Sequence, residues 1–293
     1  MADDTEESLS LSADALAALQ EFYTERDAHA EKFEMLKARV GGNGDPAAAT
    51  AAAEAETEDR NGNGNGNGNG GEGAVAVVPE LSIHTFTEDW NESQFWYSDE
   101  TANLLAEQML DGVSDDSVIA VVSTPSVFVA LKKMMTAAGY TGPKSKTYLL
   151  EHDHRFAVFP EFVYYDFAQP FKLPPDLKGT VDRMICDPPF LSNDCQTKTA
   201  MTMRWLARNP NSNSNPNSTT TTTTTTPPTN PPHAHLRVLV CTGERMAPLI
   251  TKLYGPLGVR ITTYEPQHGG LKNEFYCYAN FECAAWRWRS LEE

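Results

Sequence analysis

The stretch VDRMICDPPF, residues 181–190, decides the fold of this chain. Its first half, Val181 to Cys186, is mostly apolar and predicts a short buried strand. The strand must end at the two prolines, because proline has no N–H to donate to a sheet. Proline also favours an extended conformation in the residue before it, which directs the carboxylate of Asp187 past the carboxyl end of the strand. Ligands of open α/β sheets bind at this end.

The residues that follow this strand form a rigid row of hydrogen-bond acceptors and then one aromatic ring. Such a row suits an NH₂ group that is held and stacked while it attacks an electrophile. A strand followed by a proline-rich turn with no function is the alternative, and an isolated Asp-Pro-Pro triplet is often only that. The candidate catalytic residues are Asp187, Pro188, Pro189 and Phe190.

The composition indicates a globular protein with an acidic surface. The chain has 293 residues, of which 40% are hydrophobic and 10% aromatic, enough for one large domain or two small ones. Its net charge is −17. An acidic surface repels phosphate backbones, which argues against a nucleic-acid partner and favours a basic protein substrate. The alternative is that the acidity only keeps the protein soluble.

Cysteine usage and hydropathy indicate a soluble protein of a reducing compartment. The five cysteines include no C-x-x-C pair and resemble neither a zinc site nor a disulfide framework, so we expect no metal. The N-terminus is acidic and lacks the apolar region of a secretory signal, and no stretch is long and apolar enough for a membrane span. These features predict a cytoplasmic location.

Two low-complexity stretches divide the chain. Residues 40–73, with an Asn-Gly repeat, and residues 209–232, rich in Asn, Thr and Pro, have almost nothing to bury and predict disordered inserts. Residues 1–39 precede the first insert and are expected to be helical, with apolar residues at helical spacing from residue 9 onward. The predicted folded domain covers residues 81–285, interrupted by the second insert, and residues 286–293 are a tail.

Within this domain, apolar runs alternate with helical patterns. The predicted strands are Ser117–Val122, Tyr148–Leu150, Phe162–Tyr165, Val181–Cys186 and Arg237–Cys241, followed by an antiparallel pair, Val259–Tyr264 and Glu274–Phe281. The predicted helices are one that begins after Ser98 and then Val127–Ala138, Asp194–Ala207 and Glu244–Tyr254. The order predicts an α/β fold with a mostly parallel, doubly wound sheet. The connections after Asp153 and Asp166 show no clear helical pattern.

The segment before the first of these helices is unusually aromatic. Ser98 is a good N-cap, and Asp99 and Glu100 would lie in the first turn. Three consecutive aromatic residues precede it, and they cannot all point into one core, so at least one is expected to be accessible beside a ligand or partner. The alternative is a hydrophobic staple with one surface ring. The segment comprises Gln94, Phe95, Trp96, Tyr97 and Ser98.

Polar side chains follow four consecutive strands. These are Ser123, then Glu151 or Asp153, then Asp166, and finally the aspartate of the Asp-Pro-Pro triplet. The carboxyl ends of parallel strands share one edge of a sheet, so we expect these groups to converge. Either acid after the second strand could bind ribose hydroxyls.

The convergent groups favour a nucleoside cofactor without phosphates. Asp166 and Phe167 suit the edge and face of an adenine. The sequence contains neither G-x-G-x-x-G nor G-x-x-x-x-G-K, and the turn at residues 123–126 does not allow close approach of a pyrophosphate. S-adenosylmethionine is the common cofactor of this kind.

At this point a family resemblance becomes visible. DPPF after the fourth strand resembles the motif of amino-methyltransferases with the seven-strand, Rossmann-like S-adenosylmethionine fold, which methylate adenine amines, glutamine amides or lysines. More narrowly, the chain resembles the protein-lysine methyltransferases that act on translation elongation factor 1-alpha, a family once labelled putative N6-adenine-specific DNA methyltransferases. The resemblance covers nearly all of the chain outside the inserts and the last dozen residues. It is carried, in order, by QFWYSDET, VVSTPSVF, EHDHRF, VYYDFAQP, DPPFLS, LVCTG and NEFYCYANF.

The resemblance implies a lysine methyltransferase that uses S-adenosylmethionine and modifies elongation factor 1-alpha. Residues 187–190 would orient the acceptor amine, and residues 94–98 would close over the cofactor. Ser123, Asp153, Asp166, Phe167 and Asp187 would line the cofactor pocket, with Asp153 preferred over Glu151 for the ribose. An N6-adenine methyltransferase acting on DNA or RNA is the alternative enzyme, and a non-catalytic binding protein with the same fold is the alternative of another class.

Overall fold

The computed structural model describes residues 20, 24, 27–28, 30–38, 81–89, 94–208, 236–269 and 275–290. Both predicted inserts lie outside these residues. The chain divides into two compact units, Met1–Thr87 and Glu88–Glu293. In the first unit, residues 30–38 are helical, within the segment predicted to be so, and a short 3-10 helix, η1, spans Ile83–Thr85. The rings of Phe33 and Phe86 meet edge to face, with centroids 5.7 Å apart.

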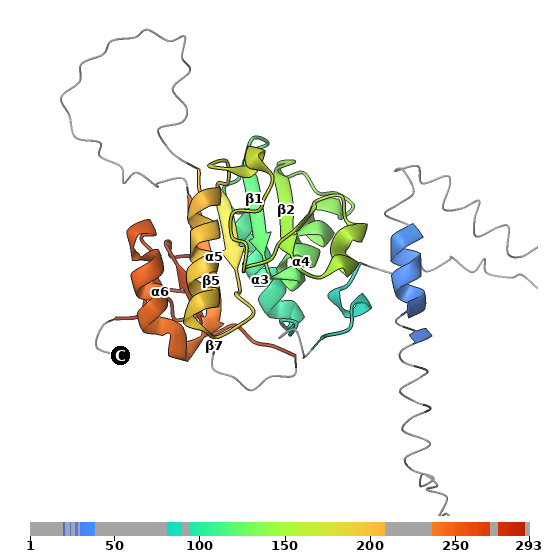
Figure 1. The fold of residues 1–293 in the computed structure, drawn as a ribbon. Helices are drawn as coiled ribbons and strands as arrows, with labels where there is room; N and C mark the ends of the chain where they lie inside the picture. Colours follow the sequence, from blue (N-terminus) through green and yellow to red (C-terminus); the bar gives the residue numbers. More distant parts are fainter. Residues whose placement is uncertain are drawn as a thin grey trace, which may run out of the picture. The chain divides into compact units, whose positions relative to one another are not determined.

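The second unit contains a seven-stranded sheet of order β3-β2-β1-β4-β5-β7-β6 (Figure 1). Strands β3 to β5 of this order run parallel, and β7 is antiparallel to both of its neighbours. The predicted mostly parallel sheet with a terminal antiparallel pair is therefore confirmed. The strands are β1 Val118–Val122, β2 Lys146–Glu151, β3 Phe162–Tyr164, β4 Arg183–Cys186, β5 Arg237–Gly243, β6 Arg260–Ile261 and β7 Phe275–Ala279.

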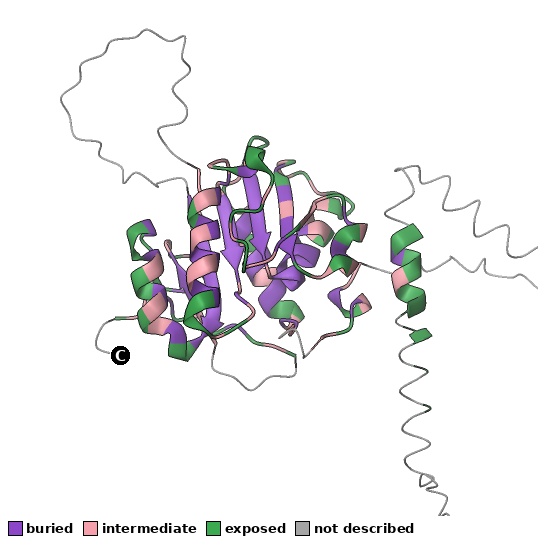
Figure 2. Cartoon of the chain, in the orientation of Figure 1, coloured by how far each residue is buried: buried purple, intermediate pink, exposed green. Residues whose placement is uncertain are grey.

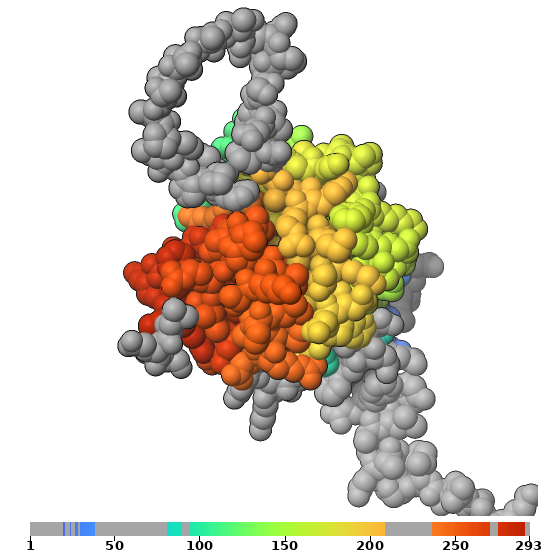
Figure 3. All heavy atoms as spheres, turned by 60° about the vertical axis from the view of Figure 1, so that its left-hand side comes forward, coloured from blue at the N-terminus to red at the C-terminus, as the bar shows by residue number. Residues whose placement is uncertain are grey.

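Helices cover both faces of the sheet (Figure 1). Helices α5 and α6 pack on one face, and α3 and α4 lie next to each other on the opposite face. In the space-filling view, α5 (gold) and α6 (orange) form the outer layer of their face (Figure 3). The bounds are α3 Asp99–Leu110, α4 Pro125–Thr136, α5 Asn193–Leu206 and α6 Ala247–Tyr254. Among the described residues, no helix is long and apolar enough to cross a membrane.

Two predicted features differ in detail from the structure. The helix expected from Glu244 begins as a 3-10 turn, η6 (Glu244–Met246), and α6 follows it and leads into a further 3-10 turn, η7 (Gly255–Leu257). Val181, expected to begin β4, makes only an isolated bridge to Ala207. The connections on either side of β3 carry only 3-10 helices, η3 (His154–Val158) and η4 (Pro175–Leu177), which agrees with the absence of a clear helical pattern there.

The core lies against the central strands. All five residues of β1 are buried because β2 and β4 flank the strand and helices cover both of its faces (Figure 2). This explains why the strand is a continuous apolar run. At the start of α3, the Ser98 hydroxyl accepts a hydrogen bond from the N–H of Thr101, so the predicted N-cap is confirmed. The cap fixes where the aromatic segment ends and the helix begins.

The C-terminal segment, residues 286–290, extends the sheet beyond β6. The N–H of Thr263 donates to the carbonyl of Arg287 over 2.8 Å, and the N–H of Arg289 donates to Ile261 over 3.0 Å. Trp286 is 2% exposed, and its indole N–H donates to the carbonyl of Phe281. The segment therefore covers the outer edge of the sheet.

Candidate functional site

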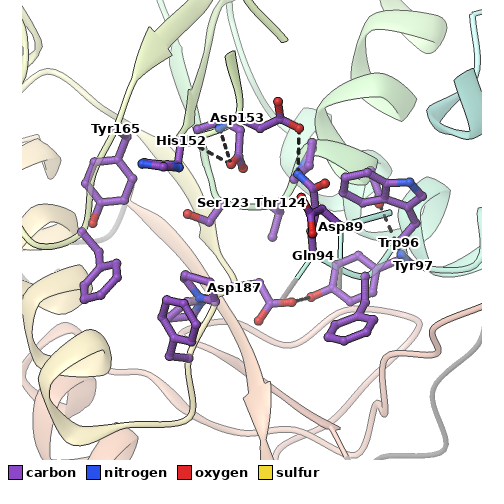
Figure 4. A pocket seen from close by; sticks show the side chains of 18 of the residues that line it. Asp89, Gln94, Trp96, Tyr97, Ser123, Thr124, His152, Asp153, Tyr165 and Asp187 are labelled. Carbon is purple, nitrogen blue, oxygen red and sulfur yellow. Dashed lines mark hydrogen bonds between the residues drawn. The ribbon is translucent and has the colours of Figure 1, made fainter. Parts of the chain in front are cut away.

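A pocket of about 680 Å³ lies at the carboxyl ends of the parallel strands (Figure 4). Its wall contains Ser123 after β1, Glu151 at the end of β2, Asp166 after β3 and Asp187 after β4. The structure thus brings together polar groups that the sequence separates by up to 64 residues. Of the candidate residues, Ser98 alone does not line the pocket, and its hydroxyl caps α3 instead. The others on the wall are Gln94, Phe95, Trp96, Tyr97, Asp153, Phe167, Pro188, Pro189 and Phe190.

Asp187 is held at the centre of the pocket by two hydrogen bonds. Its backbone N–H donates to the carbonyl of Val122 on β1 over 3.2 Å. The hydroxyl of Tyr97 crosses the pocket and donates to the Asp187 carboxylate over 2.5 Å (Figure 4). Burial raises the pKa of Asp187 to about 7, even though the tyrosine hydrogen bond lowers it. The carboxyl group can therefore gain or lose a proton near neutral pH.

The chain after Asp187 is anchored from α5. Gln196 is fully buried, and its amide Nε2 donates to the carbonyl of Phe190 over 3.2 Å and to Oγ1 of Thr242 over 3.0 Å. The ring of Phe190 is 36% exposed and meets the edge of Phe167 with centroids 5.6 Å apart. Sequence analysis missed Gln196, although a polar residue on the apolar stripe of a predicted helix is a recognisable signal.

The carboxylate of Asp153 is engaged in hydrogen bonds with other side chains of the protein. Its carboxylate accepts hydrogen bonds from Nε of Arg155 and from the side-chain amide of Gln94, the latter over 3.0 Å (Figure 4). Nη2 of Arg155 in turn donates to the side-chain oxygen Oε1 of Gln94 over 2.8 Å. Burial raises the pKa of Asp153, but the hydrogen bonds from Arg155 and Gln94 outweigh it and hold the pKa below its usual value. These three side chains form a clamp between the aromatic segment and η3.

Glu151 is the acid at the end of β2. One carboxylate oxygen accepts the backbone N–H groups of His152 and Asp153, over 2.8 Å and 3.2 Å. Burial raises the pKa of Glu151 to about 7, against the lowering effect of these two hydrogen bonds. The carboxylate of Asp166, by contrast, accepts hydrogen bonds from its own turn, from Gln169 and the N–H of Ala168, which lower its pKa.

The turn after β1 adopts an uncommon conformation. Ser123 has φ of 52°, in the left-handed region that residues other than glycine rarely occupy. Its backbone N–H donates to the carbonyl of Leu150 over 2.9 Å, so the turn is held against β2. This conformation places Ser123 on the pocket wall.

Two of the three rings in the aromatic segment, at least one of which was expected to be accessible, are buried. Trp96 and Tyr97 are 4% and 3% exposed, and Phe95 is half-buried on the pocket wall. Trp96 packs edge to face against Phe156, and its N–H donates to a carboxylate oxygen of Glu88 over 2.7 Å. These contacts of Trp96 fix the backbone next to Tyr97, whose side chain extends to Asp187.

Among the pocket residues that sequence analysis did not single out, three come from the part of the chain after residue 236. They are Arg245 on η6, His268 in the β6–β7 loop and Phe275 at the start of β7. Nothing in their local patterns distinguishes them from loop or strand residues. With Asp187, they lie on or next to strands β4 to β7, whereas Ser123, Glu151 and Asp166 lie at the ends of strands β1 to β3. The sheet order thus divides the pocket into a β1–β3 half and a β4–β7 half.

Within the described ranges, no cluster of three or more His, Cys, Asp or Glu side chains could hold a metal ion. The pocket volume falls in the range of small-molecule and cofactor sites. The buried acid at the end of β2 and the serine in the turn after β1, whose hydroxyl has no hydrogen-bond partner among the described residues, suit the hydroxyl groups of a nucleoside. The fold and this pocket suit an enzyme that binds a small-molecule cofactor at the carboxyl ends of its parallel strands.

Comparison with known proteins places the chain in a family. The family model described as "Probable N6-adenine methyltransferase" matches residues 88–283. The chain is 38% identical over 285 residues to the Saccharomyces cerevisiae "Protein-lysine N-methyltransferase EFM5", covering 96% of this chain and 95% of that protein. It is 31% identical to "EEF1A lysine methyltransferase 1" of Gallus gallus (96% and 98% covered) and 30% identical to that of Homo sapiens (95% and 95% covered).

The chain belongs to this methyltransferase family, as the sequence resemblance implied. The family model carries a nucleic-acid name, whereas these three relatives are named for lysine methylation.

Proposed function

We propose that this protein is an S-adenosylmethionine-dependent methyltransferase that modifies a lysine of translation elongation factor 1-alpha. The names of its relatives support the substrate. The observation that carries the chemistry is the position of the Asp187 carboxyl group on the pocket wall, where the Tyr97 hydroxyl donates to it and burial raises its pKa to about 7. The free cysteines of the described chain agree with a cytoplasmic location.

The residues of the β1–β3 half would hold the cofactor. When bound there, S-adenosylmethionine supplies a methyl group activated by a positively charged sulfur. We propose Glu151 as the acceptor of hydrogen bonds from the ribose, because Asp153 is already engaged by Arg155 and Gln94. Sequence analysis preferred Asp153. Glu151→Gln is expected to weaken cofactor binding more than Asp153→Asn, as measured by calorimetric titration.

The β4–β7 half would prepare the amine. A lysine has a pKa of about 10.4 in water and must lose a proton before it can attack. Desolvation among aromatic side chains lowers that pKa, and the carboxylate of Asp187 can receive the proton. Asp187 and the Pro188 carbonyl then accept hydrogen bonds from the remaining N–H groups. These contacts direct the nitrogen lone pair towards the methyl group.

The test is methyl transfer from radiolabelled S-adenosylmethionine, with elongation factor 1-alpha, unmethylated DNA and unmethylated RNA offered in parallel. We expect label on the protein alone. Asp187→Ala should lower kcat at least 100-fold, in the range of a lost general base, and leave cofactor affinity within a few fold. Near-normal turnover by this variant would refute the role of Asp187.

The second candidate is N6-adenine methylation, which the description of the family model favours. An adenine amine would use the same acceptors at Asp187 and Pro188. The net charge of −17 opposes binding to a phosphate backbone, which is why we place this function second. Label on DNA or RNA in the parallel assay, lost in Asp187→Ala, would reverse the order.

A further inference from the structure

His268 is a titratable group of the pocket that the reaction described above does not use. It lies in the β6–β7 loop and lines the pocket wall. Its ring lies between two others, with its centroid 4.6 Å from that of Tyr97 and 4.3 Å from that of Phe275. Among the described residues, its ring nitrogens make no hydrogen bond. An imidazole on a pocket wall whose nitrogens have no hydrogen-bond partner among the described residues is a candidate for binding a ligand.

The backbone fixes this imidazole in place. The N–H of Ser98 donates to the carbonyl of Gln267 over 2.8 Å, and the N–H of Gly269 donates to Trp96 over 3.2 Å. Tyr97 and His268 form an antiparallel bridge between these two hydrogen bonds. The loop is thus joined to the aromatic segment at the position of the tyrosine that reaches Asp187.

The imidazole is neutral at physiological pH. Burial lowers the pKa of His268 to about 4, although the charge of Glu88 acts in the opposite direction. A neutral imidazole has one N–H donor and one lone pair that accepts. It can accept a hydrogen bond from an amine and adds no positive charge that would repel a cationic side chain.

The sheet order indicates which ligand reaches this group. The residues proposed for the cofactor lie in the β1–β3 half, whereas His268 lies in the loop before β7 and contacts the first residue of that strand, Phe275. Tyr97 connects His268 to the carboxylate of Asp187, since its ring contacts the first and its hydroxyl binds the second. His268 therefore lies in the same half of the pocket as Asp187, where the acceptor amine is proposed to bind.

We propose that His268 binds the acceptor lysine of the protein substrate by accepting a hydrogen bond from its ammonium group, which has a third N–H until its proton passes to Asp187. The inference rests on the proposed function and adds to it a residue that determines substrate affinity. It makes His268 a binding residue for the protein substrate and assigns it no contact with the cofactor.

The test uses variants of His268 that distinguish the contribution of its aromatic ring from that of its ring nitrogens. His268→Phe keeps an aromatic ring between Tyr97 and Phe275 but removes both nitrogens, whereas His268→Gln and His268→Asn each restore one amide acceptor without the ring. We expect His268→Phe to raise KM for elongation factor 1-alpha about 10-fold, the effect of one lost hydrogen bond, with a smaller change in kcat. Its cofactor Kd and melting temperature should match the wild type. At least one amide variant should recover part of the lost affinity.

Three results would overturn the proposal. A wild-type KM in His268→Phe would show that only the ring matters, and failure of both amide variants to improve on it would show the same. A weakened cofactor Kd in His268→Phe would assign the nitrogens to the cofactor. Failure of the proposed function is distinguishable, because the wild-type protein itself would then leave elongation factor 1-alpha unlabelled.

Discussion

Tyr97 and Asp187 are 90 residues apart in the chain, and their side chains lie 2.5 Å apart in the pocket. Burial raises the pKa of Asp187 and the tyrosine hydroxyl moderates the rise, so the pair sets the pH at which the carboxylate becomes available. Tyr97 is itself buried and has a pKa well above its usual value, first because of burial and then because of the Asp187 charge. It therefore remains a hydrogen-bond donor throughout the physiological range.

Tyr97→Phe removes this donor and keeps the ring. The pKa of Asp187 is expected to rise above its wild-type value of about 7, because the ionised carboxylate loses its hydrogen bond. A carbon-13 NMR titration of the Asp187 carboxyl carbon measures the shift, with Asp187→Asn to assign the resonance. An unchanged midpoint in Tyr97→Phe would contradict the assigned role.

Glu151 makes the stability of the cofactor-free protein depend on pH. Its folded-state pKa of about 7 exceeds the ordinary value of 4.5, so the folded state binds the proton more tightly than the unfolded state. The resulting stabilisation is complete below about pH 4.5 and is lost as the pH rises through 7. The glutamine of Glu151→Gln does not titrate. The unfolding free energy of this variant minus that of the wild type should therefore increase as the pH rises from 5 to 8, by roughly 3 kcal/mol at most. Urea unfolding at several pH values measures the difference, and a constant difference would contradict it.

At the scale of elements, the sequence predicted every strand of the sheet and the helices between them. A buried strand is a continuous apolar run, and a helix start such as that of α3 is marked by a capping residue, here Ser98. Both signals lie within a few residues of sequence, so they can be recognised locally. The contacts that complete the pocket could not be predicted. The hydrogen bond from Gln196 to Thr242 and the bridge between Tyr97 and His268 depend on how segments far apart in the sequence pack, and hydrophobic periodicity does not record this.

Gln196 is the side chain through which α5 controls the turn after β4. Gln196→Met keeps the approximate volume but leaves the carbonyl of Phe190 and the hydroxyl of Thr242 without this donor. We expect a loss of about 1–3 kcal/mol in unfolding free energy and a fall in kcat, because buried polar groups lose their partner and residues 187–190 become less well positioned. Denaturant unfolding and steady-state kinetics are the measurements. Full stability together with full activity would show that the anchor is dispensable.

At the scale of the whole molecule, the described part of the C-terminal segment is part of the fold. The sequence predicted a tail from residue 286, since its alternation of Trp and Arg is compatible with either a strand or a frayed end. That boundary stays a prediction. The hydrogen bonds of Arg287 and Arg289 to the β6 region resemble those of an added strand.

Trp286 should therefore matter for stability. Its side chain is buried against Tyr264 and Phe281, with ring centroids 6.0 Å and 5.4 Å away. Trp286→Ala is expected to lower the unfolding free energy by about 3–5 kcal/mol, the usual cost of removing a large buried aromatic side chain. Urea unfolding measures it, with Trp286→Phe as the milder control. A change below about 1 kcal/mol would show that the segment is not packed in solution.

The short aromatic segment touches both halves of the pocket. Gln94 is tied to Asp153 at one end, and three residues later Tyr97 is tied to Asp187 at the other. Because the segment is short, a ligand that restricts the motion of Gln94 also restricts the motion of Tyr97, and the reverse holds as well. The two substrates of the enzyme should consequently bind with mutual cooperativity: whatever factor the first adds to the affinity of the second, the second adds to that of the first.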